Sequence, residues 1–402
     1  MKAELTNRWV VLAILFVVGL TAPVHYQAVA ALAPFLRADV GLNYTDIGLM
    51  TGLFMMPGVV LAGPMGPISA WIGDRMTLII GIALVAASAS LFALSDDYMV
   101  MIACRIVGGA GAVAATALLP KMINDWFAGK EIATAMAIIA SAVGLGIGLA
   151  MAGLPILATA MSWRWAMHAA AGACTLAIAL LLLVYRDVGD VVPAVGKGGK
   201  PARILWRIDS SEFILSALAG VGRGLFSSGY SVFMMFIPPL VIARGMSAVD
   251  AGMLTSVAAL ISIVSVPLGG YLSDRTGRPG LFIVGGSLLS ALMCVLVTSV
   301  TPVILWVGLF GAFRGGCTGG LMSLPSRVLK PQSRNTGFAV VSTSYFVCMT
   351  AFPPVGGYLL DVTGNTAAPL LFAALLWFSI SILLSIFKWL ERRWIGVNVL
   401  PA

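Results

Sequence analysis

The chain has 402 residues, of which 60% are hydrophobic and only 10% are charged, and its formal net charge is +8. Apolar stretches follow one another almost from end to end, which excludes an ordinary soluble domain and predicts a lipid-embedded protein. The longest polar segment runs only from Arg186 to Ser210, so no soluble domain is expected. Because basic loops at a membrane surface account for the positive charge, we expect no nucleic-acid partner.

Twelve hydrophobic stretches approach or exceed the ~20 residues that a helix needs to cross a bilayer. We expect membrane-spanning helices at 9–36, 45–71, 78–94, 99–120, 131–158, 164–185, 211–241, 248–272, 280–300, 302–326, 335–360 and 367–390. The first stretch is too long for a signal-peptide core, so we expect it to be retained. The sequence therefore predicts an all-α membrane protein.

Two parts of the chain resemble each other at a distance of about half its length. Gly41–Gly52 (GLNYTDIGLMTG) matches Gly245–Ser256 (GMSAVDAGMLTS) at a shift of 204 residues. Internal repeats in a hydrophobic chain are typical of secondary transporters, whose site lies between two moving halves. We expect two pseudo-symmetric six-helix bundles at residues 1–190 and 211–402, joined by a cytoplasmic linker at 191–210.

Lys and Arg are distributed unequally about these spans. With the N-terminus in the cytoplasm, 18 of the 24 Lys and Arg residues lie on the cytoplasmic side, and Arg37, Arg164 and Arg244 lie on the other. The positive-inside rule then favours this orientation. We expect a multi-pass protein of a bacterial inner membrane with both termini in the cytoplasm.

The five cysteines all fall within predicted spans and show no CxxC spacing. Buried small apolar residues are a commoner role for such cysteines than disulfides or metal ligands. No nucleophile–base pair or metal-ligand cluster emerges from the spans. We therefore expect no enzymatic activity, no metal and no cofactor.

Two loops identify the family that the chain resembles. Gly269–Arg278 (GGYLSDRTGR) resembles the signature loop between helices 8 and 9 of the major facilitator superfamily, and Ala70–Leu78 (AWIGDRMTL) is a degenerate copy between helices 2 and 3. Arg105 opens the segment RIVGGAG, which resembles the Arg-bearing motif of that family's fourth helix. The resemblance covers essentially the whole chain and implies alternating access between two bundles.

In this family the two loops suggest a conformational latch, and a tight, well-capped turn is the alternative. We expect the loop aspartates to cap the helices that follow, and the glycines to allow close helix packing. The degenerate first copy should be the weaker latch. The candidate gating residues are Asp74, Arg75, Gly270, Asp274, Arg275, Gly277 and Arg278. In helix 11, Pro353 and Pro354 predict a bend or local unwinding.

Three arginines lie deep inside predicted spans, at positions 105, 223 and 314, and no Asp or Glu lies at that depth. A guanidinium in the membrane costs at least ~2.5–3.5 kcal/mol unless it is paired or hydrated, so the three arginines predict a wet cavity. The missing countercharge is then the substrate, because the guanidinium fork suits carboxylate or phosphate oxygens.

We expect a cavity lined chiefly by helices 1, 4, 7 and 10. Its candidate substrate-binding residues are Arg223, Arg314, Arg105, His25, Tyr26, Gln27, Tyr230, Ser227 and Tyr345. Alternatives stay open for several of them. Arg105 matches a family motif and so has a structural or gating role as its alternative. His25 is either a proton carrier or a neutral buried histidine, and the hydroxyl and amide groups could instead bond neighbouring helices.

Within the superfamily, Asp125–Glu131 (DWFAGKE) is similar to bacterial cyanate and nitrate/nitrite carriers, although helices 2 and 8 lack the arginines of the nitrate carriers. We expect a monomeric secondary transporter that moves a small organic or inorganic anion across the bilayer, as a symporter or antiporter that uses protons or a counter-anion. One alternative is a proton-coupled exporter of drugs or neutral metabolites. Another is a non-transporting sensor or scaffold.

Overall fold

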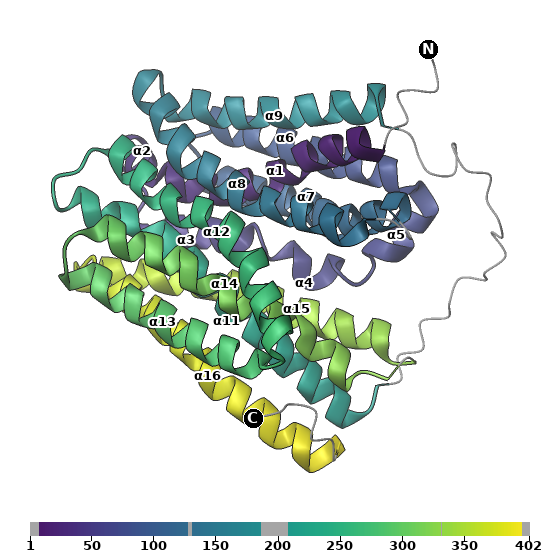
Figure 1. Ribbon diagram of the computed structural model, residues 1–402. Coiled ribbons are helices and arrows are strands. Elements are labelled where there is room, and N and C mark those ends of the chain that lie inside the picture. The colour runs from purple at the N-terminus through teal and green to yellow at the C-terminus, as the bar shows by residue number, and fades with distance from the viewer. Residues whose placement is uncertain (1–7, 128–130, 186–207, 331, 396–402) are drawn as a thin grey trace.

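The computed structural model describes residues 8–127, 131–185, 208–330 and 332–395, and its regular elements there are all α-helices (Figure 1). The N-terminal bundle contains α1 (Arg8–Ala31), α2 (Ala33–Val40), α3 (Tyr44–Leu53), α4 (Pro57–Leu61), α5 (Met65–Ile72), α6 (Asp74–Leu94), α7 (Tyr98–Phe127), α8 (Ile132–Ala160) and α9 (Trp163–Leu183). The C-terminal bundle contains α11 (Ser210–Ile242), α12 (Ala248–Thr276), α13 (Pro279–Ser299), α14 (Val303–Val328), α15 (Arg334–Thr363) and α16 (Ala368–Ile395).

Twelve candidate membrane spans occur in the described residues, by helix length and apolar composition. The predicted fold class is therefore confirmed, with most boundaries within a few residues of those expected. Nearly all of the expected linker at 191–210 lies outside the described residues, so the exact division between the bundles stays a prediction.

The second predicted span, at 45–71, is wrong as a continuous helix. It consists of α3, α4 and α5, with turns immediately before Pro57 and around Pro64. Proline lacks an N–H and its ring clashes with the preceding turn, so Pro57 is the first residue of α4 and Pro64 directly precedes α5 as its N-cap. The break carries Phe54 and Met55 out of the helix and toward the interior of the protein.

The opposite result holds for Pro353 and Pro354, which lie inside the continuous helix α15. A bend or local unwinding was expected there; the helix is not unwound, and the bend stays a prediction. Helix α3 packs closely on this segment: a Cβ added to Gly48 would lie 2.5 Å from the Pro353 carbonyl oxygen, and one added to Gly52 would collide with that of Thr350. The close packing of a neighbouring helix is the setting in which membrane helices tolerate proline.

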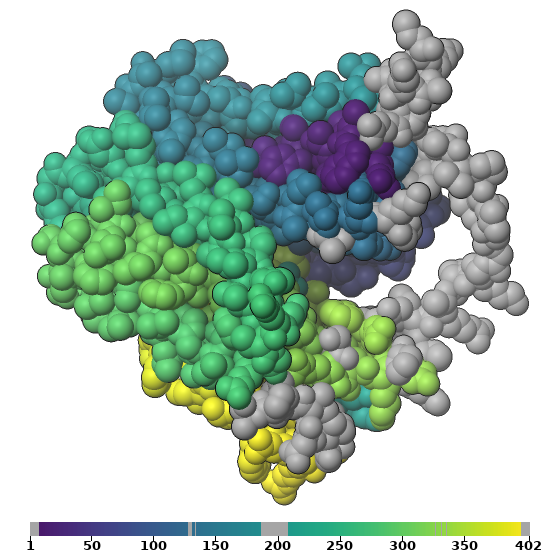
Figure 2. Space-filling view, in the orientation of Figure 1, coloured from purple at the N-terminus to yellow at the C-terminus, as the bar shows by residue number. Residues whose placement is uncertain are grey.

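The two bundles meet on one side of the protein and diverge on the other (Figure 1). We call the side where α1 begins and α16 ends the terminal side, and the opposite side the far side. The bundles pack through α3 against α15 and through α8 against α12. Figure 2 shows the surface hollowed between the bundles on the terminal side.

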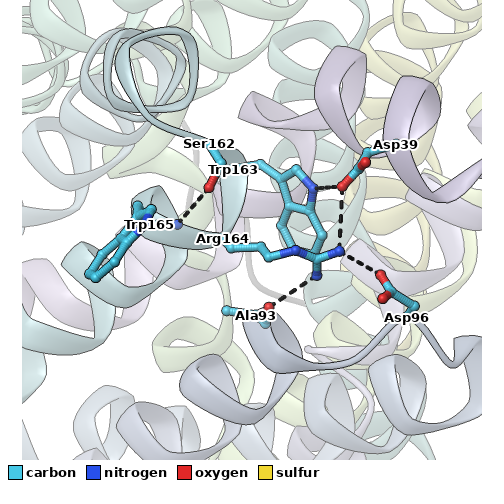
Figure 3. Close-up of polar contacts among 7 residues, drawn as sticks. All are labelled: Asp39, Ala93, Asp96, Ser162, Trp163, Arg164 and Trp165. Atoms are coloured by element: carbon cyan, nitrogen blue, oxygen red, sulfur yellow. Dashed lines mark hydrogen bonds and ion pairs between the residues drawn. The ribbon is translucent and has the colours of Figure 1, made fainter.

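On the far side, Arg164 joins three segments of the N-terminal bundle (Figure 3). Its guanidinium pairs with Asp96 at 2.6 Å and Asp39 at 3.4 Å, and it donates to the Ala93 carbonyl. The Trp163 indole donates to the same Asp39 carboxylate at 2.6 Å. These contacts hold α2 and the end of α6 against the start of α9, and they do not reach the C-terminal bundle.

Candidate substrate-binding site

A cavity of about 530 Å³ lies between the two bundles. Its walls come from α1, α7, α11 and α14, as the sequence predicts for helices 1, 4, 7 and 10, and also from α8, α12 and α15. The lining residues of α7, α8, α12 and α14 lie mostly in the halves of those helices nearer the terminal side. The cavity therefore occupies the middle of the protein and extends toward the terminal side.

Arg223 and Arg314 both line this cavity. The guanidinium carbon of Arg314 lies 3.9 Å from the ring centroid of Tyr230, and that of Arg223 lies 4.7 Å from the centroid of Tyr345. Stacking on a ring engages the face of a guanidinium and leaves its in-plane N–H groups for an acceptor. The Nε atoms of both arginines are buried without a hydrogen-bond partner among the described residues.

Other donors around these arginines also lack partners. The Tyr230 hydroxyl and Thr318 Oγ1 line the same cavity and are buried without an acceptor among the described residues. The cavity wall contains no Asp or Glu in the described part of the chain. Buried donors without acceptors are costly, so this arrangement suits an anion.

Helical spacing brings these groups together. Ser227 and Tyr230 follow Arg223 by four and seven residues on α11, and Thr318 follows Arg314 by four on α14. Positions i, i+4 and i+7 share one face of a helix. The sequence interpretation overlooked Thr318 and Phe226. Thr318 follows Arg314 by four residues and Phe226 follows Arg223 by three, and these helical spacings were the signal that could have identified them.

Arg105, the third deep arginine, is not among the cavity-lining residues. Its Nε donates to Met50 O at 3.0 Å, Nη1 to His25 O at 2.8 Å and Nη2 to Tyr26 O at 3.2 Å. Its guanidinium carbon also lies 4.3 Å from the Phe54 ring. Carbonyl oxygens thus replace the water that the charge has lost, and the side chain ties α7 to α1 and α3.

The remaining candidates divide between the cavity and the protein interior. Tyr26, Ser227 and Tyr345 line the cavity. Gln27 is buried outside its wall, with Nε2 unpartnered among the described residues. His25 is 2% exposed, its Nδ1 lies 2.9 Å from Thr21 O, and it borders a small separate pocket beside Arg105. The structure therefore places neither His25 nor Gln27 in contact with the cavity.

Contacts between the bundles close the far side of the cavity. The Tyr26 hydroxyl donates to Ser231 Oγ at 2.6 Å, which joins α1 to α11. The Asp361 carboxylate of α15 accepts from the Tyr44 and Thr45 backbone N–H groups at 3.1 and 2.7 Å and from the Thr45 hydroxyl at 2.7 Å. A carboxylate at a helix N-terminus satisfies free N–H groups and complements the helix dipole.

The first signature loop makes its contacts inside its own bundle. Asp74 pairs with Lys121 at 2.7 Å and makes no cap hydrogen bond at the start of α6. The Arg75 Nε and Nη2 atoms donate to the carbonyls of Leu181 and Leu182 at the end of α9, at 3.0 and 2.9 Å. Asp74 lies in the first turn of α6, where its charge complements the helix dipole as expected, but no backbone N–H is recorded donating to its carboxylate in the described residues.

The second loop also differs from expectation. Asp274 lies in the last turn of α12, because the helix ends at Gly277, whose φ of 65° is left-handed. The sequence interpretation expected Asp274 to cap the following helix, and this expectation is wrong because Asp274 belongs to the end of the preceding one. The closely packed glycine of this loop is Gly269, where an added Cβ would collide with the Gly315 carbonyl oxygen. Gly270, in contrast, has open space around such a Cβ.

Neither loop makes a recorded contact with the opposite bundle within the described residues. Arg275 interacts weakly with Tyr271 of its own helix, at 3.4 Å. No hydrogen bond or ion pair of the Arg278 side chain is recorded in the described part of the chain. This absence of bridging contacts accords with the separation of the bundles on the terminal side.

Comparison with known proteins identifies the family. A model of the major facilitator superfamily matches residues 11–340 and 213–398. The hexuronate transporter of Bacillus subtilis (strain 168) is 22% identical over 393 residues, which cover 90% of each chain. The class G tetracycline resistance protein of Vibrio anguillarum is 30% identical over 160 residues, or 38% of this chain and 39% of that one.

Solved structures agree with this fold. A bacterial homologue of the human lysosomal transporter Spinster, in an inward-facing and occupied conformation, has a TM-score of 0.71 at 15% identity and 98% coverage of both chains. The chain belongs to the major facilitator superfamily and is a multi-pass membrane transporter of that family.

Proposed function

We propose that the protein is a secondary transporter of anions that binds its substrate at Arg223 and Arg314. The observation that carries this proposal is a cavity with two arginines, unpartnered at Nε, and no carboxylate in its described wall. Guanidinium groups without counter-ions inside a membrane are unfavourable. A bound anion would supply both the missing charge and the missing acceptors.

The contacts between the bundles support an alternating-access mechanism. In this conformation the far side is held by the Tyr26–Ser231 and Asp361–Thr45 hydrogen bonds, and the cavity extends toward the terminal side. The uneven distribution of Lys and Arg supports a cytoplasmic location for the terminal side. The conformation is then inward-facing, and the protein would lie in a bacterial inner membrane.

Coupling is proposed to be anion exchange or proton entry on the substrate itself. A proton-carrying residue needs access to the transport cavity, and His25 is 2% exposed and lies outside the cavity wall. The cavity wall also offers no carboxylate among its described residues. Exchange should therefore persist without a pH gradient, and His25→Ala should not remove any pH dependence of uptake.

The alternative is a proton-coupled exporter of drugs or neutral metabolites. Its support is the partial similarity to a tetracycline resistance protein and the largely apolar cavity wall. The test uses proteoliposomes offered labelled organic anions, inorganic anions and a lipophilic cation. We expect the wild-type protein to take up an anion and the Arg223→Gln, Arg314→Gln double variant to lose this uptake. Transport of the cation, with anion uptake absent or unaffected by the double variant, would support the exporter.

A further inference from the structure

The two bundles contribute unlike walls to the cavity. On the C-terminal side lie the donors without recorded acceptors: the Nε atoms of Arg223 and Arg314, the Tyr230 hydroxyl and Thr318 Oγ1. All four belong to α11 and α14. The groups able to hold an acidic function are thus gathered on one bundle.

The N-terminal wall offers no comparable donor among its described residues. Its polar side chains are Tyr26, Thr116 and Ser141. Tyr26 donates to Ser231 Oγ at 2.6 Å, Thr116 to Ala112 O at 3.1 Å and Ser141 to Ile138 O at 2.6 Å. The rest of this wall is apolar and includes Val113, Leu119, Met136, Ile139 and Val143.

The size of the cavity also bears on the substrate. Its volume of about 530 Å³ falls within the roughly 300–1,000 Å³ that is usual for small-molecule sites. A three- or four-atom inorganic anion would contact the arginines and leave the apolar wall facing water. An organic body large enough to reach the N-terminal wall would displace that water, which is favourable.

We infer that the substrate is an amphipathic organic anion, with its acidic group at Arg223 and Arg314 and an apolar, sparsely hydroxylated body against the N-terminal bundle. This inference rests on the proposed anion-transport function and specifies its substrate class. A polyhydroxylated acid would bury hydroxyl groups against Val113, Met136 and Val143 without acceptors or donors. Unpaired polar groups of this kind strongly disfavour binding.

The experiment measures uptake of labelled phenylacetate into proteoliposomes and its competition by unlabelled compounds. Phenylacetate has an acidic group and an apolar ring, glucuronate has an acidic group and several hydroxyls, and nitrate has no organic body. We expect phenylacetate to compete at concentrations about tenfold or more below those of glucuronate and nitrate, the size of effect expected when buried polar groups lack partners. The neutral analogue 2-phenylethanol should not compete, because it cannot pair with the arginines.

A variant of the apolar wall tests the placement of the substrate's body. Val143 lines the cavity and is 51% exposed, so that a polar side chain can be introduced there with little effect on packing. Val143→Asn should weaken competition by phenylacetate and strengthen competition by glucuronate. The ratio of the glucuronate concentration to the phenylacetate concentration needed for half-inhibition should then fall by about threefold or more, the effect expected for one hydrogen bond. The matched control is Leu149→Asn, at a residue of the same helix α8 that is 50% exposed and does not line the cavity, and it should keep the wild-type preference.

The outcomes separate this inference from the function on which it rests. Preference for glucuronate or nitrate, still lost in the Arg223→Gln, Arg314→Gln double variant, would overturn the substrate class and leave anion transport standing. An unchanged ratio in Val143→Asn would overturn the placement of the apolar body. Absence of anion uptake together with uptake of a lipophilic cation would overturn both proposals.

Discussion

Arg105 and Arg314 lie in α7 and α14, the fourth membrane spans of the two bundles, and their surroundings differ sharply. The guanidinium of Arg105 donates to three carbonyl oxygens, at 2.8 to 3.2 Å. Arg314 lies over Tyr230, and its Nε has no partner in the described residues. Depth in the membrane therefore does not distinguish a structural arginine from a binding one. The presence or absence of hydrogen-bond acceptors around the guanidinium does.

The largest effect should follow from Arg105→Gln. This change removes a charge that serves three buried carbonyls, and a buried group left unpaired costs about 1–3 kcal/mol. We expect the free energy of unfolding to fall by roughly 3 kcal/mol, so that the purified protein has a clearly lower thermal midpoint.

Arg314→Gln is the matched control for this stability measurement. It breaks no recorded hydrogen bond and removes a poorly solvated charge, so the thermal midpoint should stay the same or rise. Equal losses of stability in Arg105→Gln and Arg314→Gln would contradict the division between a structural and a binding arginine.

The next effect concerns transport itself. Arg314→Gln should lower anion uptake by roughly 10- to 100-fold, because a charge-assisted hydrogen bond contributes about 1.5–3 kcal/mol. Arg314→Lys should recover part of the loss, since an ammonium keeps the charge and lacks the planar fork. Uptake is measured in proteoliposomes matched for protein content, and full activity in Arg314→Gln would refute the assignment.

Asp361→Asn should shift the balance between conformations by about 1 kcal/mol, or roughly fivefold, because it weakens charged hydrogen bonds between α15 and α3. The rate at which an impermeant thiol reagent, added from the far side, labels Ser227→Cys reports far-side opening. We expect faster labelling in Asp361→Asn.

The matched control for Asp361 is Asp96→Asn. Asp96 lies on the same side and pairs with Arg164 inside the N-terminal bundle (Figure 3). Its substitution should leave the labelling of Ser227→Cys unchanged. A labelling rate in Asp361→Asn no greater than that of this control would show that the Asp361 contacts do not hold the far side closed.

The smallest effect compares the two signature loops. Asp74 pairs with Lys121 at 2.7 Å, whereas Asp274 has no recorded ion pair in the described part of the chain. We expect Asp74→Asn to lower the free energy of unfolding by about 0.5 kcal/mol, as for a partly exposed ion pair, and Asp274→Asn to leave it unchanged. Chemical denaturation of both variants measures this difference, and equal losses of stability would contradict it.

The sequence predicted the transmembrane fold because hydrophobic length responds to one physical constraint, the thickness of the bilayer. The sequence also predicted that Arg223 and Arg314 line the same cavity, because the position of each side chain follows from the number of its helix and its depth along that helix. It failed at the second helix, where Pro57 and Pro64 interrupt an apolar stretch that reads as one span. At Pro353–Pro354 the helix is continuous, so of the two effects expected there, a bend or local unwinding, the unwinding does not occur.

What the sequence determined by itself is what hydrophobicity, length and charge specify locally: twelve spans, two related halves and a scarcity of deep carboxylates. The tertiary structure decided which deep arginine is satisfied, because the carbonyl acceptors of Arg105 come from residues 55 to 80 positions away in the sequence. It also decided which side is closed, since Asp361 meets Thr45 across 316 residues. Such partners depend on how the helices pack, and no local pattern in the chain specifies them.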